Sequence, residues 1–265
     1  MPETNSLPDV STLSISQATP ATFSELYFQH TFLVFIQVGS KRVLCPINGE
    51  LIGQAEDVMI FPPGSVVTLE NRPMLDHDYR AIGVCFSHHM IEAIFSNEIS
   101  RAKPVGIQIL QTGSEQAREI LDTIQATLND KRLPQAIRQH RLLEPLVWLK
   151  YHGIQLSPHE DENPLSKIRR LIETDLSHPW RSSEVADYFA ISESTMRRWL
   201  AKSGQGFAKT LQNTRLEHGL SLLQSTDMPI AEIAFNCGFK TPSHFSDSFR
   251  KRFGIKPSEI RKVED

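Results

Sequence analysis

Basic side chains cluster at two places in the last hundred residues of the chain. Arg197 and Arg198 are adjacent in "SESTMRRWLAKSG", and Arg250, Lys251 and Arg252 are consecutive in "SHFSDSFRKRFG". Guanidinium and ammonium groups donate charge-assisted hydrogen bonds to phosphate oxygens, and arginine can also donate two hydrogen bonds to O6 and N7 of guanine. Both clusters therefore suit a nucleic-acid surface, provided that helices hold them outward.

Charge is distributed unevenly along the chain, which has a net charge of −3. Residues 1–163 contain 12 Lys and Arg against 19 Asp and Glu, and residues 164–265 contain 16 against 12, so the two parts carry −7 and +4. An acidic part joined to a basic part predicts a nucleic-acid-binding module attached to a second domain.

The residues around Arg197 have the pattern of a helix-turn-helix. Val185 and Ala186 lie on the inner face of a first helix, and Met196 and Leu200, four residues apart, lie on the inner face of a second. Ser192 precedes the second helix and is expected to cap its free backbone N–H groups. The second helix of such a unit, here called the reader helix, enters the major groove of DNA. The residues left outside, and predicted to contact DNA, are Glu193, Ser194, Arg197, Arg198 and Lys202.

A second unit of the same kind begins at Pro229. Gly238 ends its first helix, Thr241 caps the next, and Phe245 and Phe249 are the buried pair of that second reader helix. The basic trio at its end is expected to contact phosphates, which position a protein without reading sequence. The predicted DNA contacts of this unit are Lys240, Pro242, Ser243, Ser246, Asp247, Arg250, Lys251 and Arg252.

A leucine-rich helix over residues 207–227 connects the two units. It would hold two reader helices in successive major grooves, about 34 Å apart. From about residue 163 to residue 261 the sequence resembles the AraC/XylS family of bacterial transcription regulators. The segments that carry the resemblance are "SESTMRRWLAKSGQGF", "RLEHGLSLL", "MPIAEIAFNCGF" and "SHFSDSFRKRFGIKPSEIR".

The resemblance implies promoter recognition by two helix-turn-helix units in the cytoplasm, with double-stranded DNA and RNA polymerase as partners. One position departs from the family pattern, because Asp247 stands where members often have arginine. A carboxylate cannot neutralise phosphate, although it can accept a hydrogen bond from N4 of cytosine.

The N-terminal half reads as a β-domain. Between Thr31 and Arg80, short runs rich in Val, Ile and Phe are separated by turn signals such as Asn48-Gly49, which predicts a small barrel or sandwich. Family members commonly carry an effector-binding barrel followed by helices that dimerise. The expected fold is therefore α+β: a mobile arm (1–22), a cupin-like sensor and dimerisation domain (23–152), a linker (153–163) and an AraC-type DNA-binding domain (164–265).

Five residues of the β-domain are candidates for an effector site. Phe32, Val34 and Phe61 alternate with their neighbours and can line a pocket, although core packing is the competing interpretation. Lys41 and Arg42 can anchor a carboxylate effector, and the competing interpretation is an exposed basic pair on a hairpin.

An apolar stripe follows the β-domain. Ala117, Leu121, Ile124 and Leu128 are spaced by four, three and four residues, which predicts one face of a helix. We expect this face to form a homodimer contact; the alternative is a helical lid on the same domain.

Other classes of function lack a sequence signal. No apolar run approaches the roughly 18 residues of a membrane helix, and the first residues do not resemble a signal peptide. Cys45, Cys85 and Cys237 form no CxxC pair, and the histidines form no HxH pair, so neither a metal site nor a cofactor is expected. No catalytic constellation indicates an enzyme. Two alternatives to an effector-controlled regulator remain open: a regulator controlled by a partner protein, and a cupin-like enzyme tethered to DNA.

Overall fold

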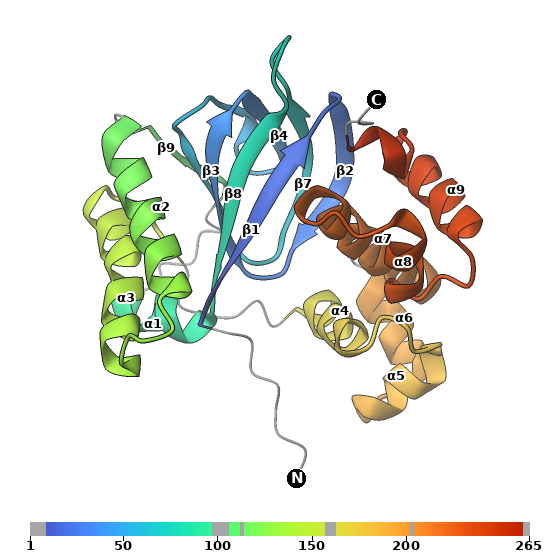
Figure 1. Cartoon of the computed structure of the whole chain (residues 1–265). Coiled ribbons are helices and arrows are strands. Elements are labelled where there is room, and N and C mark those ends of the chain that lie inside the picture. Colours follow the sequence, from blue (N-terminus) through green and yellow to red (C-terminus); the bar gives the residue numbers. More distant parts are fainter. Residues whose placement is uncertain (1–8, 97–105, 112–113, 157–162, 202–203, 262–265) are drawn as a thin grey trace. The chain divides into compact units, whose positions relative to one another are not determined.

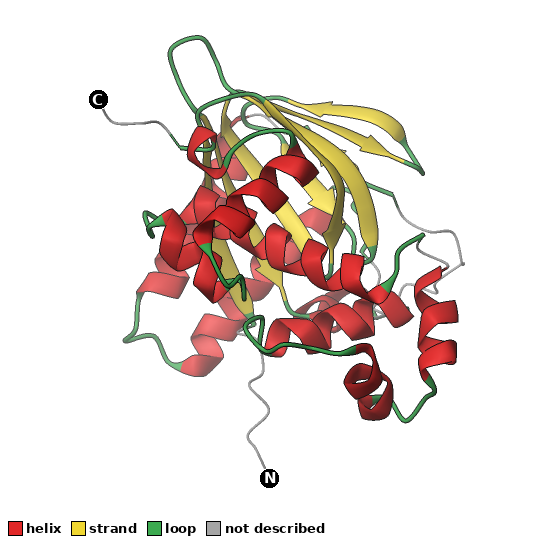
Figure 2. Ribbon diagram, turned by 90° about the vertical axis from the view of Figure 1, so that its right-hand side faces the viewer, coloured by secondary structure: helices red, strands yellow, loops and turns green. Residues whose placement is uncertain are grey.

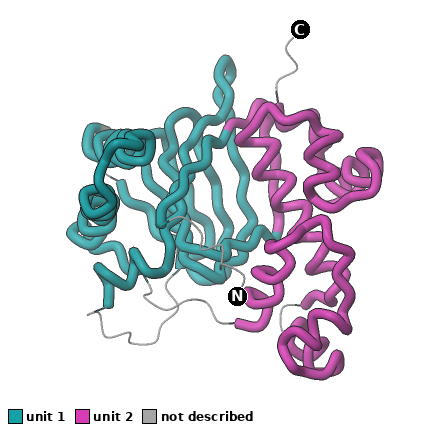
Figure 3. Tube along the Cα trace, turned by 60° about the horizontal axis from the view of Figure 1, so that its bottom comes forward, with its two compact units in different colours: residues 1–15, 25–160 teal, residues 16–24, 161–265 magenta. Residues whose placement is uncertain are grey.

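The computed structural model describes residues 9–96, 106–111, 114–156, 163–201 and 204–261. The chain divides into two compact units, one comprising residues 1–15 and 25–160 and the other residues 16–24 and 161–265 (Figure 3). The division at residue 160 falls inside the predicted linker, of which residues 157–162 lie outside the described ranges.

Nine strands are described, and they form two antiparallel sheets. The five-stranded sheet has the order β1-β8-β3-β6-β9 and the four-stranded sheet the order β2-β7-β4-β5. In Figure 2 the strands are yellow, and the loop over residues 73–78 between β7 and β8 extends beyond their ends. The strands are β1 (Val10–Gln17), β2 (Ala21–Phe28), β3 (Thr31–Val38), β4 (Ser40–Cys45), β5 (Gly49–Gly53), β6 (Val58–Phe61), β7 (Ser65–Arg72), β8 (Tyr79–Phe86) and β9 (Gln108–Leu110).

Two predictions about the N-terminal half are changed by the structure. Of the predicted small barrel or sandwich, the barrel is not formed, because β1 and β2 join different sheets and the described hydrogen bonding leaves both sheets open. A closed barrel requires one continuous ladder of strands. The mobile arm over residues 1–22 is wrong from Val10 onward, because β1 occupies Val10–Gln17 and β2 begins at Ala21. Residues 1–8 lie outside the described ranges.

Three helices cover one face of the five-stranded sheet: α1 (His88–Phe95), α2 (Ser114–Asn129) and α3 (Gln135–Tyr151). Figure 1 shows them gathered beside the strands. Alternate residues of β3 and β8 point toward these helices, and among them Leu33, Val84 and Phe86 are fully buried. Their burial against helical side chains provides the hydrophobic stabilisation of this face.

The stripe predicted to form a dimer is part of this core. Ala117 and Leu121 are 4% exposed, Ile124 is 0% exposed, and Leu128 packs against the same cluster. These side chains are already covered by the chain's own sheet and helices, so they offer no free surface to a partner. The predicted dimer contact is therefore corrected to the lid, although a dimer formed through another surface stays a prediction.

From Pro164 onward, the described residues of the second unit are mainly helical. Its helices are α4 (Pro164–Thr174), α5 (Ser182–Tyr188), α6 (Glu193–Ala201), α7 (Phe207–Ser225), α8 (Ile230–Asn236), α9 (Pro242–Phe253) and the 3-10 helix η1 (Pro257–Glu259). α7 contacts α4 as well as α8 and α9, so it is the central element of the unit. Gly219 permits the close approach of α9, because a Cβ atom at Gly219 would lie 2.7 Å from the ring of Phe245.

Candidate functional site

The first helix-turn-helix unit is formed by α5, a tight turn and α6. Ala190 adopts a φ of 52°, and the backbone N–H of Ile191 donates to the carbonyl of Ala186 at 3.0 Å. The Ser192 hydroxyl accepts a hydrogen bond from the backbone N–H of Thr195 at 3.1 Å, which confirms the predicted N-cap. The turn and cap together fix the direction in which α6 leaves the first helix.

The two sides of α6 differ sharply in character. Met196 and Leu200 are 2% and 1% exposed. The Arg198 guanidinium donates to the Thr195 hydroxyl at 3.2 Å, and the Glu193 carboxylate accepts from the hydroxyl of Ser182. Lys202, predicted to extend this face, lies outside the described ranges. Of the residues predicted to contact DNA from α6, Glu193, Ser194, Arg197 and Arg198 are exposed, as the spacing predicts.

The second unit, α8 to α9, repeats the arrangement. The Thr241 hydroxyl accepts from the backbone N–H of His244 at 3.2 Å and caps α9, again as predicted. Gly238 and Gly254 end the two helices with φ of 75° and 78°, the left-handed conformation that glycine adopts without a steric penalty. Phe245 on the inner side is fully buried.

The outer side of α9 mixes polar and charged residues. Pro242 and Ser246 are half-buried, while Lys240, in the preceding turn, is exposed. His244 was missed by the sequence reasoning, although a helical period of 3.6 residues places it on the same side as Asp247 and Lys251. The exposed residues of α9 are Ser243, His244, Asp247, Arg250 and Lys251.

Arg252 does not belong to this outer face, which corrects its predicted DNA contact. Its side chain is 9% exposed, and its guanidinium donates to one carboxylate oxygen of Glu217 on α7. The other oxygen of Glu217 accepts from Arg169 on α4, whose side chain is 5% exposed. Burial raises the pKa of the Glu217 carboxyl, and both arginines counteract that effect. Consecutive helical residues point about 100° apart, so three consecutive basic residues cannot all face the same way.

The predicted pocket residues of the β-domain lie on strands β3 and β6. Phe32 pairs with Phe61 across β3 and β6, and Val34 pairs with Met59, so these side chains lie on one face of the sheet. A Cβ atom at Gly53 of the other sheet would lie 2.8 Å from the Met59 sulfur, so this face is the inner one. The predicted pocket residues Phe32, Val34 and Phe61 thus all face the interior.

Lys41 also points into this interior, beside Asn71 of the neighbouring strand. It is 3% exposed, donates to the side-chain oxygen of Asn71, and places Nζ 5.1 Å from the centre of the Tyr79 ring. Burial lowers the pKa of the Lys41 ammonium to about 7. The Tyr79 hydroxyl is buried, and no described residue forms a hydrogen bond with it. Among the described residues, no carboxylate lies within 4.0 Å of Lys41.

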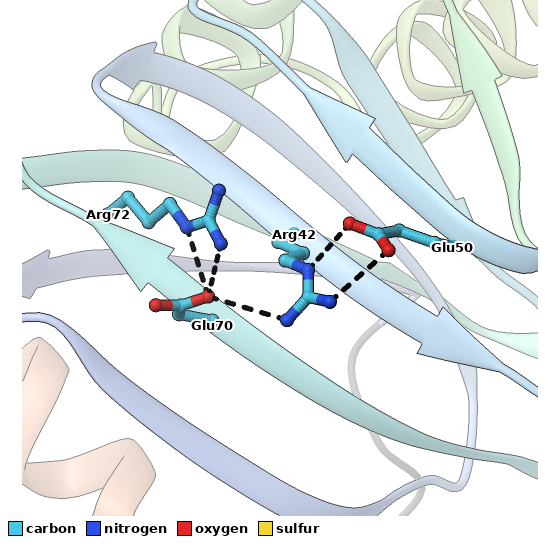
Figure 4. A network of polar contacts seen from close by, with 4 residues as sticks. All are labelled: Arg42, Glu50, Glu70 and Arg72. Atoms are coloured by element: carbon cyan, nitrogen blue, oxygen red, sulfur yellow. Dashed lines mark hydrogen bonds and ion pairs between the residues drawn. The ribbon is translucent and has the colours of Figure 1, made fainter.

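Arg42 lies on the opposite face and belongs to a different set of contacts. Figure 4 shows its guanidinium between Glu50, at 2.7 Å, and Glu70, at 3.9 Å. Arg72 completes the group with a contact of 2.7 Å to Glu70. This ladder joins β5, β4 and β7 on the outer surface, so the prediction that Arg42 shares an effector site with Lys41 is wrong.

The described ranges contain no group of three or more His, Cys, Asp or Glu side chains arranged to hold a metal ion. Every helix within them is too short or too polar to cross a membrane.

Comparison with known proteins identifies the helical unit. A family model described as a helix-turn-helix domain matches residues 185–263. The transcriptional regulator YdeO of Shigella flexneri is 31% identical over 96 residues, and the transcriptional activator RhaS of Enterobacter sp. (strain 638) is 28% identical over 160 residues. Residues 185–263 match a helix-turn-helix domain of the AraC type. The resemblance seen in the sequence is thereby confirmed.

The matches extend over only part of each relative. The aligned region covers 36% of this chain and 38% of YdeO, and 60% of this chain and 58% of RhaS. At the level of the fold the likeness is broader: ToxT of Vibrio cholerae, in a crystal structure with bound unsaturated fatty acid, matches with a TM-score of 0.66 at 14% identity. That match covers 94% of this chain and 93% of ToxT, so the β-rich domain and the AraC-type domain both have counterparts there.

Proposed function

We propose that the protein is a sequence-specific DNA-binding transcription regulator of bacterial promoters. The observation that carries this proposal is the pair of capped reader helices, each with a buried apolar side and an exposed polar side that includes two basic residues. Within α6, Arg197 and Arg198 are suited to major-groove base edges, and within α9 Ser243, His244 and Arg250 occupy the corresponding side. Lys240 and Lys251 are suited to phosphates.

Selection of binding sites tests this function directly. The full chain would be incubated with a random double-stranded DNA library, and bound DNA sequenced over successive rounds. We expect a motif of two half-sites about one helical turn apart, one for each reader helix. Binding that shows no enriched motif, or that does not weaken as salt rises, would contradict the proposal, because phosphate contacts release counterions.

Regulation of promoters also implies a cellular location, a protein partner and an oligomeric state. The protein would act in the cytoplasm, contact RNA polymerase at the promoter, and bind as a homodimer through a surface other than the buried stripe on α2. Light scattering of the full chain tests the last point, since a monomer of about 30.0 kDa would exclude it.

A small anionic effector in the β-domain is the second element of the proposal. Its support is the buried Lys41 ammonium, which has no carboxylate partner among the described residues, together with the unpartnered Tyr79 hydroxyl nearby. An isolated buried charge is costly, and a bound carboxylate would neutralise it. The fatty acid bound by ToxT suggests a lipid carboxylate as the first compound to test.

Calorimetric titration with oleate tests the effector. We expect heat of binding with the wild type and none with Lys41→Met, a variant of similar length that lacks the charge. Arg42→Met serves as the control, because Arg42 lies in the outer ion-pair ladder (Figure 4). Equal binding by all three proteins would remove Lys41 from the site.

A further inference from the structure

The AraC-type domain has two halves that meet on α7. The first half consists of α4, α5 and α6, and the second of α8, α9, η1 and the residues that follow to Arg261; α7 contacts α4, α8 and α9. The distance and angle between the two reader helices therefore depend on how each half is attached to α7.

Each half has a separate attachment to α7. In the first half, the Arg215 guanidinium of α7 donates to the carbonyls of Leu176 and His178 at 2.9 and 2.8 Å. In the second half, Arg261 donates to the carbonyls of Leu223 and Met228 at 3.0 and 2.8 Å. Each of these hydrogen bonds reaches one half only, although the halves also touch directly at Gly238, where a Cβ atom would lie 2.1 Å from the carbonyl oxygen of Leu176.

Glu217 differs because its single carboxylate contacts both halves. One oxygen accepts from Arg169 of α4 and the other from Arg252 of α9. The exposed fractions of the three side chains are 5%, 11% and 9% for Arg169, Glu217 and Arg252. A carboxylate between two buried guanidinium groups forms charge-assisted hydrogen bonds with strong directional preference, unlike the surrounding apolar contacts.

We propose that Glu217 is a positioning residue that sets the spacing of the two reader helices by joining Arg169 and Arg252. The consequence for specificity rests on the proposed DNA-binding function: a fixed spacing makes the protein select one separation of its two half-sites. Adding one base pair moves a half-site by about 3.4 Å along the helix axis and rotates it by roughly 35°. Buried ionic groups have their best-attested role in fixing such a register.

The direct test measures the distance between the reader helices without DNA. Spin labels would be placed on the full chain at Ser194→Cys and Ser243→Cys, both exposed positions, and the distance distribution recorded by pulsed electron resonance. The native Cys45 and Cys237 are buried and Cys85 is half-buried, so the unsubstituted chain, labelled in parallel, supplies the background. We expect one narrow distance distribution in the labelled chain that keeps Glu217. With Glu217→Gln added, we expect the distribution to be clearly broader or shifted.

Two further variants make the result decisive. Arg252→Gln removes only the α9 side and leaves Glu217 paired with Arg169, so the buried charge stays neutralised and the domain should fold. It should also broaden the distribution. Glu232→Gln, which neutralises an exposed carboxylate on α8, should leave it unchanged. Circular dichroism establishes which variants are folded, and a wild-type distribution in folded Glu217→Gln or Arg252→Gln would overturn the proposal.

A DNA measurement then tests the consequence for specificity. The probes are the duplex selected by the wild type and the same duplex with one base pair inserted between its half-sites. We expect the wild type to prefer the first by at least roughly tenfold, and Arg252→Gln to lose most of that preference. A preference that Arg252→Gln retains would contradict the inference. Absence of any selected duplex would instead refute the proposed DNA function, while the spin-label result would stand by itself.

Discussion

Arg252 and Lys251 are adjacent basic residues with opposite surroundings, so replacing each with alanine separates fold stability from DNA binding. Lys251 is exposed, whereas Arg252 is bonded to Glu217 and lies 5.1 Å from the centre of the Phe253 ring. Arg252→Ala removes a hydrogen bond between charged groups, which contributes about 1.5–3 kcal/mol, and a cation–π contact of about 0.5–1 kcal/mol. The expected loss in free energy of unfolding is therefore about 2–4 kcal/mol.

Thermal unfolding provides the assay. For a domain of about a hundred residues this loss lowers the melting temperature by on the order of 10 to 25 °C. Trp180 and Trp199 report on the helical unit once Trp148 of the other unit is replaced by phenylalanine. Lys251→Ala should change stability by less than about 0.5 kcal/mol but reduce the salt dependence of DNA binding by about one phosphate contact. An unchanged melting temperature in Arg252→Ala would mean that the contact with Glu217 does not stabilise the domain.

Three further predictions concern other parts of the molecule. Arg198→Ala should weaken binding to the selected duplex by about 1–3 kcal/mol and relax preference at one base pair; a uniform loss across all sequences would mean that Arg198 contacts phosphate only. The pKa of Lys41 is about 7 in the folded chain and about 10.4 in the unfolded chain. Between these pH values Lys41 is protonated in the unfolded chain but not in the folded one, so the free energy of unfolding should rise with pH by roughly 1.4 kcal/mol per unit. Urea titrations from pH 7 to 10 should show this rise in the wild type but not in Lys41→Met. Leu121→Glu should unfold the β-domain because it buries an unpaired charge, and Trp148 fluorescence would report the unfolding. A folded, monomeric variant would instead support a dimer contact at Leu121.

Local signals in the sequence predicted the helical half closely. The caps at Ser192 and Thr241 and the buried pair Phe245 and Phe249 follow from residue type and helical spacing alone, and the structure confirms each of them. Arg252 could not be assigned in this way. Whether a basic side chain on a helix meets solvent or a buried carboxylate depends on Glu217, which lies 35 residues earlier in the chain.

In the β-domain, the sequence pattern predicted which helix face is apolar but not what covers it. The stripe from Ala117 to Leu128 shows that one helical face is apolar, but not whether a partner or the chain's own sheet covers it. Alternation in β4 did contain the signal for Lys41, which shares a face with the buried Val43 while Arg42 does not. Lysine is rarely buried, so the residue type alone predicted that Lys41 would be exposed.

The central claim, that the two reader helices recognise DNA sequence, is tested most directly by the binding-site selection with the full chain, followed by titration of the enriched duplex against a scrambled duplex of the same composition. We expect a motif of two half-sites about one turn apart and a preference for the enriched duplex of at least roughly a thousandfold. Equal affinity for the two duplexes at physiological salt would contradict it.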